Sequence, residues 1–301
     1  MVNSVMNERQ MPTTELTAAW PGIDLATSRL RVCRHGLMLY LAADTTIGHA
    51  LELYGEFAES ENELMMEVVK PGDVLLDVGA NVGSVTLPLA RRIGPSGLLI
   101  SFEPQRIIFQ HLCANIALNG LTHVDARRAA VGPAAGQIRV PMVAAATSTN
   151  FGAVTLLGNA EGEPVPMIAI DDLKLERCAL IKIDVEGMEA AVLQGAAQTI
   201  ARVRPAICFE AKRTAATRSC LDWLLKREYR LYWHFAAFFR RSNFRNVANN
   251  VFGDRGDINA LAIPAESLLR FELPSVASPD DDWQVACRKW LASERDQRFF
   301  R

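Results

Sequence analysis

The sequence predicts an α/β protein built around a doubly wound, mostly parallel sheet. Short apolar runs at 74–78, 98–102, 179–185 and 205–209 alternate with helical patterns near 83–93, 105–118, 188–203 and 215–228. Runs that are apolar on both faces, with helices of about 10 to 15 residues between them, are typical of a parallel sheet covered by helices on both sides. In such a fold, we expect the ligand beyond the carboxyl ends of the strands.

Length and composition support this prediction and exclude several other classes of protein. The chain has 301 residues, half of them hydrophobic and 22% charged, which favours a large folded core over disorder. A net charge of −2 disfavours a strongly basic polyanion binder, although it leaves room for a local basic patch. No stretch approaches the roughly 20 apolar residues of a membrane span, and the first ten residues lack an apolar signal core. Because the six cysteines show no disulfide or zinc spacing, we expect a cytoplasmic protein with reduced thiols.

Segments outside the alternation are expected to form extensions. An apolar–polar alternation at 29–41, broken at His35-Gly36, predicts a β-hairpin, and helical spacing at 59–69 predicts a helix. Three aspartates before 283–292 favour the start of a short helix. We therefore divide the chain into an N-terminal extension with a hairpin at 1–50, a main domain at 51–264 and a C-terminal helical tail at 265–301.

Two regions within the main domain depart from simple alternation. Residues 136–170 have few helix signals, so we expect an inserted hairpin or loop at the sheet edge. Residues 230–235 and 258–263 predict a late antiparallel strand pair at the edge. The N-terminal extension, the 136–170 insertion and the 232–255 loop carry the fewest motifs, and we expect the substrate-binding parts to come from them.

A glycine-rich turn directly after the strand at 74–78 is the first candidate site. Residues Asp77-Val78-Gly79-Ala80-Asn81-Val82-Gly83 lead from that strand into a helix. Glycine lets the backbone turn sharply and approach a ligand, and a helix N-terminus can hold polar groups. The glycines are one residue closer together than in a dinucleotide fingerprint. With Asp77 at the strand end, the turn favours a cationic, hydroxyl-bearing ligand such as S-adenosylmethionine, although it could simply connect strand and helix.

Carboxylates follow the neighbouring strands as well. Glu103, in Phe102-Glu103-Pro104, comes 24 positions after Gly79 and is placed to accept hydrogen bonds from ribose hydroxyls, unless it is an exposed loop residue. Lys182, Asp184 and Glu186 share one side of the next strand by period two. Such charges are costly unless they are paired or used. We interpret Lys182 as a structural partner of a carboxylate and Asp184 as functional.

Three further features are candidates with two interpretations each. Glu210 ends the strand at 205–209 and is either a general base or a structural partner of Lys212. His234 lies in an aromatic strand and is either a core residue or part of a substrate wall. The basic segment from Arg240 to Arg245 could bind phosphate, a nucleotide-linked sugar or RNA, or it is a solvated loop.

Residues 50–264 resemble the FkbM-type family of S-adenosylmethionine-dependent methyltransferases. The matching motifs, in order, are Tyr54-Gly55-Glu56, Pro71-Gly72-Asp73, Asp77 to Gly83, Phe102-Glu103-Pro104, Asn115 and Asn119-Gly120, Ala129-Ala130-Val131-Gly132, Ile170 to Leu173, Lys182 to Gly187, Leu193 to Ala196, and Arg204-Pro205 with Glu210. One departure is Ser84, where the family often has an aromatic residue.

The resemblance implies a doubly wound, seven-stranded, Rossmann-like class I methyltransferase sheet. It also implies that the amino-acid end of S-adenosylmethionine is bound by the glycine turn, the ribose by Glu103 and the adenine near Ala130. The cofactor-binding residues expected from it are Glu56, Asp77, Gly79, Ala80, Asn81, Gly83, Glu103, Pro104, Ala130 and Asp184.

The sequence therefore predicts an O-methyltransferase that methylates a hydroxyl of a small-molecule natural product or sugar. We expect the base to be Asp184 first, then Glu210 or His234. A divalent metal could bind Asp184, Glu186 and Glu210, although the sequence does not require one. The alternatives are an RNA methyltransferase, an inactive methyltransferase-fold binding protein and, last, a nucleotide-dependent dehydrogenase. The acceptor is left open, and so is the oligomeric state, a homodimer included.

Overall fold

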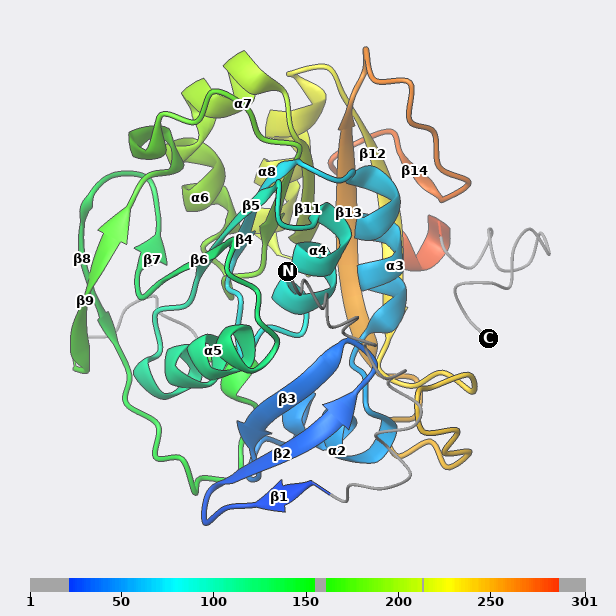
Figure 1. Cartoon of the computed structure of the whole chain (residues 1–301). Coiled ribbons are helices and arrows are strands. Elements are labelled where there is room, and N and C mark those ends of the chain that lie inside the picture. Colours follow the sequence, from blue (N-terminus) through cyan, green and yellow to red (C-terminus); the bar gives the residue numbers. More distant parts are fainter. Residues whose placement is uncertain (1–21, 155–160, 213, 287–301) are drawn as a thin grey trace, which may run out of the picture.

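The computed structural model describes residues 22–154, 161–212 and 214–286, and it has the predicted α/β architecture (Figure 1). Eight strands form the central sheet in the order β14-β12-β13-β11-β10-β4-β5-β6. Their bounds are β4 Val74–Val78, β5 Leu98–Phe102, β6 Val124–Arg127, β10 Leu180–Ile183, β11 Ala206–Glu210, β12 Tyr229–Ala237, β13 Gly256–Pro264 and β14 Ser275–Val276. The parallel strands are β4, β5, β6, β10 and β11. Strand β13 lies between β11 and β12 and is antiparallel to both.

The sheet has one strand more than the seven predicted. The extra strand, β14, has only two residues and pairs with β12 at the edge, too short for an alternating pattern to reveal it. The predicted late strand pair is formed by β12 and β13, but β13 lies inside the sheet.

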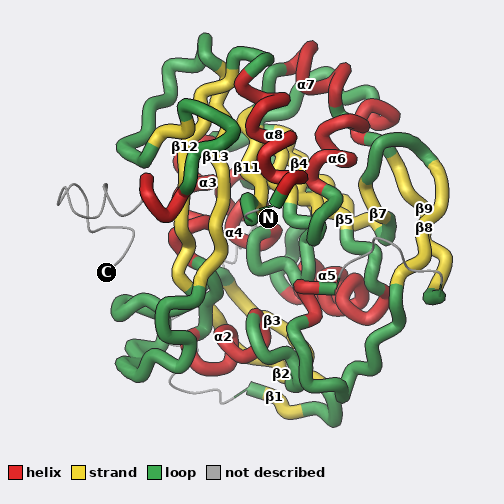
Figure 2. The backbone as a smooth tube through the Cα atoms, turned by 180° about the vertical axis from the view of Figure 1, so that it is seen from behind, coloured by secondary structure: helices red, strands yellow, loops and turns green. Residues whose placement is uncertain are grey.

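Helices cover both faces of the sheet, as a doubly wound fold requires (Figures 1 and 2). Helices α3 (Glu59–Val68), α4 (Thr86–Ile93) and α5 (Arg106–Leu118) contribute to the core on one face, where Leu75 and Leu99 point. Helices α6 (Glu189–Gly195), α7 (Ala197–Val203) and α8 (Ala215–Leu225) cover the other face, where Leu76 and Ile100 point. The helix predicted over 188–203 is thus two helices, which meet at Ala196.

The N-terminal residues that the structure describes form a small separate sheet. Strands β1 (Ile23–Asp24), β2 (Ser28–Cys33) and β3 (Gly36–Leu41) are antiparallel neighbours, so the hairpin predicted at 29–41 is present, and α2 (Ile47–Tyr54) follows. The Asn115 side chain docks this sheet on α5. It accepts from Leu39 N at 2.6 Å and donates to Leu39 O at 2.9 Å and to Val82 O at 2.8 Å. One side chain therefore links the hairpin to the glycine turn.

The 136–170 region forms its own sheet and does not extend the edge of the main one. Strands β8 (Gly136–Val140) and β9 (Glu163–Ile168) form the expected hairpin, and β7 (Ala130–Val131) pairs with β9. Short 3₁₀ helices, η1 (Phe151–Ala153) and η2 (Ile170–Leu173), lie within or directly after this region.

Some expectations lie partly outside the described residues. These are the first 21 residues of the N-terminal extension and residues 287–292 of the tail helix predicted at 283–292. The described part of that helix, residues 283–286, is helical. The five cysteines within the described parts are all free thiols. None of the helices found there has the length and apolarity to cross a membrane.

Candidate functional site

A cavity opens where the central parallel strands end. Its wall is formed by residues from the ends of β4, β5, β10 and β11 together with segments from the rest of the chain. The segments with the fewest motifs contribute to its wall, through Ile47 after the hairpin, Gly152 in the insertion and Phe238 after β12. The ionisable side chains on the described part of the wall are Glu61, Glu103, Lys182, Asp184, Glu186, Glu210 and Asp257.

The glycine turn after β4 brings backbone to the cavity floor. Gly79 has φ +83°, and a Cβ built there would lie 1.8 Å from the backbone oxygen of Asp184. Only glycine therefore fits between the ends of β4 and β10. Gly79, Ala80 and Asn81 all line the cavity, as predicted, whereas Gly83 lies behind Ser84 in a separate small recess.

Glu103 lies on the wall at the end of β5. Its carboxylate accepts hydrogen bonds from Asn81 N at 3.0 Å and from Gln105 N at 2.8 Å. Burial raises the pKa of Glu103 to about 7, against the lowering effect of these two bonds. A carboxylate has about four acceptor positions, so those not used by the backbone remain available to hydroxyl donors. Pro104, the next residue, also lines the cavity.

The side chain of Lys182 places its ammonium group beneath the glycine turn. Its Nζ donates to Gly79 O at 3.0 Å and to Asp184 Oδ2 at 3.3 Å, and it lies 3.7 Å from Asp77 Oδ1. Burial alone would lower the pKa of Lys182, but the charges of Asp184 and Asp77 outweigh it and raise that pKa. The structural interpretation of Lys182 is confirmed by these contacts.

Asp77 needs a correction as a cofactor-binding residue. It is fully buried and does not line the cavity. Its carboxylate accepts from Thr86 Oγ1 at 2.6 Å and faces Lys182, so it supports the turn from below. The strand register explains this placement, because Asp77 is paired with Lys182 one residue before the end of β4.

Asp184, Glu186 and Glu210 form a carboxylate cluster at the ends of β10 and β11. One oxygen from each lies within 4.8 Å of the others. Lys212 places its Nζ 2.5 Å from Glu186 Oε2 and 2.9 Å from Glu210 Oε2, so Glu210 does have the predicted structural partner. Burial, and then the charge of Asp184, raise the pKa of Glu210 to about 8. A divalent cation at this cluster would have to displace the Lys212 ammonium.

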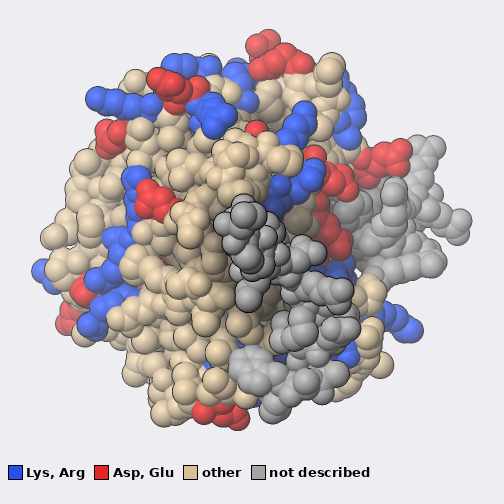
Figure 3. Space-filling view, in the orientation of Figure 1, with Lys and Arg blue, Asp and Glu red and all other residues tan. Residues whose placement is uncertain are grey.

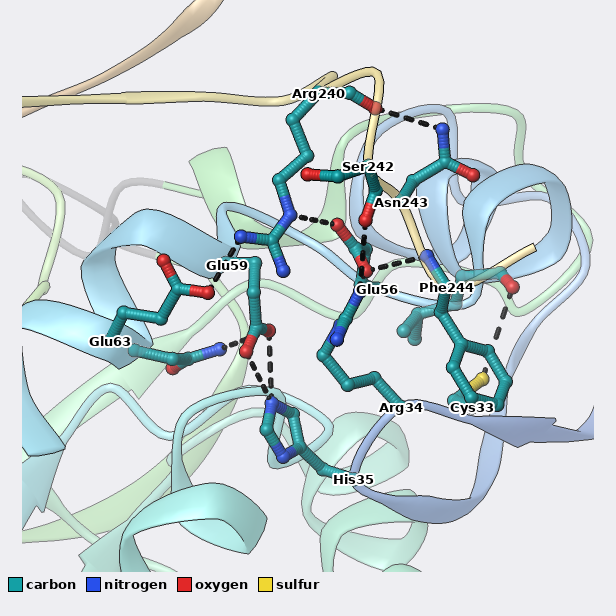
Figure 4. A network of polar contacts seen from close by, with 12 residues as sticks. Cys33, Arg34, His35, Glu56, Glu59, Glu63, Arg240, Ser242, Asn243 and Phe244 are labelled. Carbon is teal, nitrogen blue, oxygen red and sulfur yellow. Dashed lines mark hydrogen bonds and ion pairs between the residues drawn. The ribbon is translucent and has the colours of Figure 1, made fainter. Parts of the chain in front are cut away.

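Glu56 is the second cofactor residue that the structure corrects (Figure 4). It is buried, but away from the cavity. Its carboxylate binds Arg34 Nε and Arg240 Nε, both at 2.6 Å, and accepts from Phe244 N at 2.8 Å. We define these residues as the Glu56 clamp. It joins the hairpin, the turn between α2 and α3, and the segment after β12.

The basic segment at 240–245 is largely used inside the protein. Arg240 also binds Glu63 Oε1 at 2.6 Å, and Arg245 donates to Val32 O at 3.0 Å. Arg241 is exposed. On the face shown in Figure 3, basic and acidic side chains are interspersed. The polyanion-binding interpretation of this segment therefore loses two of its three arginines, Arg240 and Arg245.

His234 does not reach the cavity wall. It is 2% exposed, and burial lowers its pKa to about 4. In the sheet register it pairs with Asn259 of β13, which in turn pairs with Glu210 of β11. Strand β13 therefore separates His234 from the carboxylate cluster. This position does not fit the predicted role of His234 as a candidate base.

Ala130 lines a small apolar recess beside the main cavity. The recess shares Gly79, Pro104 and Val185 with the main cavity, so the two adjoin. Its other lining residues are Val78, Phe102, Ala129, Val131 and Met188.

Sequence reasoning missed two cavity carboxylates, Glu61 and Asp257. Glu61 is in the first turn of α3, where an acidic residue is common because of the helix dipole. Asp257 comes directly before the strand predicted at 258–263 and is the second residue of β13. A signal for Glu61 existed, since it lies on the buried side of α3 with Leu64 and Met65. Its proximity to Asp257 depends on the packing of α3 against β12.

Comparisons with known proteins found one matching family model and several similar solved structures. A sequence model described as "Methyltransferase FkbM domain" matches residues 77–231, just over half of the chain. No curated protein matches the sequence. Among solved structures, the methyltransferase FkbM from Methylobacillus flagellatus KT has 18% identity and a TM-score of 0.41 over 66% of this chain, and 50% of that chain is covered. This chain thus spans about half its length.

Two further solved structures match with similar sequence identity, TM-score and coverage. Precorrin-6y C5,15-methyltransferase from Geobacter metallireducens GS-15 has 13% identity and a TM-score of 0.44, with 67% of this chain and 87% of that chain covered. The O-methyltransferase TomG from Streptomyces achromogenes, involved in tomaymycin synthesis, has 11% identity and a TM-score of 0.41, with 68% and 78% covered.

Proposed function

The chain belongs to the FkbM methyltransferase family, and from that membership we propose that it transfers a methyl group from S-adenosylmethionine to a hydroxyl of a small molecule or sugar. The observation that carries the proposal is the placement of Glu103. Its carboxylate is oriented by two backbone amides and lies on the same wall as Gly79, Ala80 and Asn81. A hydroxyl-binding acid next to a close backbone approach suits a nucleoside with an amino-acid tail.

The cavity residues fit that cofactor in three places. Glu103 would accept from the ribose hydroxyls, and the apolar recess at Ala130 and Pro104 would hold the adenine ring. The glycine turn and Asp184 would hold the amino-acid end, where the carboxylate suits an ammonium group. When bound, the cofactor supplies an electrophilic methyl group, and the protein mainly holds the two reactants in line.

Glu210 is the base that the geometry favours. It lies beside Asp184 on the cavity wall, and its pKa of about 8 is close to the operating range of a general base. Asp184 already contacts Lys182, which suits a role in binding better than a role in proton transfer. Glu210 would thus take the hydroxyl proton while Lys212 steadies its carboxylate.

Calorimetry with S-adenosylhomocysteine tests this proposal directly. We expect the wild-type protein to bind it, and Glu103→Ala to weaken binding about tenfold or more through loss of charged hydrogen bonds. Glu103→Gln keeps the size of the side chain and controls for unfolding, while Glu67→Gln changes an exposed acid on α3. Absence of binding to wild type, or equal binding by Glu103→Ala, would contradict the proposal.

A further inference from the structure

The part of the cavity away from the glycine turn is acidic on three sides. Glu61 comes from α3, Glu210 from β11 and Asp257 from β13, and Phe238 adds an aromatic surface. Glu210 pairs with Asn259, and Asp257 is two residues before Asn259, so both carboxylates project from the same face of adjacent strands. We call these three carboxylates the acidic wall.

Cations on the described part of the cavity wall are scarce. Lys182 is the single lysine or arginine there, and its ammonium is already bound to Gly79 O and Asp184. Lys212 lies half exposed at the rim, over Glu186 and Glu210. A phosphate, sulfate or carboxylate on the acceptor would therefore find no lysine or arginine on the described wall that is not already paired.

Glu61, like Asp257 and unlike the other cavity carboxylates, has no hydrogen-bond or ion-pair partner among the described residues. It is 7% exposed and lines the cavity. Asp184, Glu186 and Glu210 each contact a lysine, and Glu103 accepts two backbone amides. A buried, uncompensated carboxylate is costly, and natural proteins tolerate such exceptions mainly at functional sites.

We propose that the methyl acceptor carries an ammonium or comparable cationic group, which Glu61 and Asp257 bind while the hydroxyl faces Glu210. This inference rests on the proposed function, because it specifies the acceptor of that reaction. Charge-assisted hydrogen bonds from an ammonium would supply the counterpart that Glu61 lacks. The contact of Lys212 with Glu186 and Glu210 shows that carboxylates at this end of the sheet hold an alkylammonium group in this fold.

The carboxyl groups of the acidic wall have pKa values above their usual range. Burial raises the pKa of Glu61 to about 7; the charge of Lys182 opposes this rise, and the neighbouring carboxylates, Asp184 first, add to it. Burial with Asp184 and Glu61 raises the pKa of Asp257 well above its usual range, against the lowering effect of Lys212 and Lys182. The charged groups that face Glu61 from the packed elements are Asp77, Lys182, Asp184, Glu210 and Asp257. A bound cation favours the ionised forms, so amine affinity should rise between about pH 6 and about pH 8.

Three matched polyols test the proposal. D-Glucamine, D-sorbitol and D-gluconate share a hydroxylated carbon chain and end in an ammonium, a hydroxyl and a carboxylate, respectively. Each is titrated by saturation-transfer NMR against the protein saturated with S-adenosylhomocysteine. We expect glucamine to bind about tenfold tighter than sorbitol, and gluconate weakest. Equal binding of sorbitol, or no detectable binding of glucamine, would overturn the proposal.

Variants separate the acidic wall from the cofactor site. Glu61→Gln should abolish most of the preference for glucamine and leave S-adenosylhomocysteine binding unchanged, and Glu67→Gln on the exposed side of α3 should change neither. Loss of S-adenosylhomocysteine binding in Glu61→Gln would assign Glu61 to the cofactor instead and refute the inference. If wild type fails to bind S-adenosylhomocysteine, the proposed function is refuted. The binding of glucamine is then measured on the free protein, so the two failures can be told apart.

Discussion

Replacing Glu61 by glutamine should stabilise the protein, and increasingly so as the pH rises. The pKa of Glu61 is raised by burial from 4.5 to about 7 in the folded state. Between these two values the folded state holds a proton that the unfolded state has lost, so ionisation of Glu61 opposes folding more strongly as the pH increases. From the two pKa values, ionisation of Glu61 lowers the free energy of unfolding by about 1 kcal/mol at about pH 5.5 and by about 3 kcal/mol at about pH 8.5.

Urea unfolding of both proteins across this pH range measures the effect. Glutamine has the shape of the protonated acid but no charge to desolvate, so the advantage of Glu61→Gln over wild type should grow by about 2 kcal/mol from the acidic to the alkaline end. Glu67→Gln, on the exposed side of the same helix, should stay within about 0.5 kcal/mol of wild type throughout. A pH-independent difference, or destabilisation at alkaline pH, would refute the reasoning that Glu61 is buried without a counterpart.

Three further changes test other parts of the structure. Lys182→Met should cost about 4 kcal/mol in urea unfolding because it leaves Asp77 buried and uncompensated, and a second change, Asp77→Asn, should restore part of the loss. Glu56→Gln should cost about 3 kcal/mol by breaking the Glu56 clamp, and an unchanged stability would show that the two arginines bind elsewhere. With an acceptor in hand, kcat should rise with pH to a plateau above about 8, and Glu210→Gln should remove that rise together with most activity, whereas a retained profile would exclude Glu210 as base.

The sequence predicted those site residues whose position follows from strand order. Gly79, Glu103 and Asp184 each follow a parallel strand, and parallel strands deliver their carboxyl ends to one edge, so they meet in the cavity. Asp77 and Glu56 also belong to the family motifs, but their side chains do not line the cavity. Membership in a motif does not reveal on which side of a turn a side chain emerges. Asp77 lies one residue too early in β4, and Glu56 faces two arginines.

Residues that require contacts between distant elements could not be predicted in this way. Glu61 and Asp257 are almost 200 positions apart and lie on one wall only because α3 packs against β12, the neighbour of β13. The basic segment after β12 illustrates the opposite failure. Its charge suggested a surface for polyanions, but Arg240 finds Glu56 and Glu63, which belong to a turn and helix far earlier in the chain.

A short segment, residues 56–61, connects the Glu56 clamp to the acidic wall, because Glu56 lies at its start and Glu61 at its end. Ala58 lies between Glu56 and Glu61, lines the cavity and has φ 44° and ψ 41°, a left-handed conformation that costs a non-glycine residue about 1 kcal/mol or more. Such a conformation persists only where the surroundings impose it, and the clamp fixes the chain two residues earlier through Arg34 and Arg240. The hairpin and the segment after β12 therefore determine where α3 begins and, through it, where Glu61 enters the cavity. Acceptor specificity would then be set by segments that carry none of the cofactor-binding motifs.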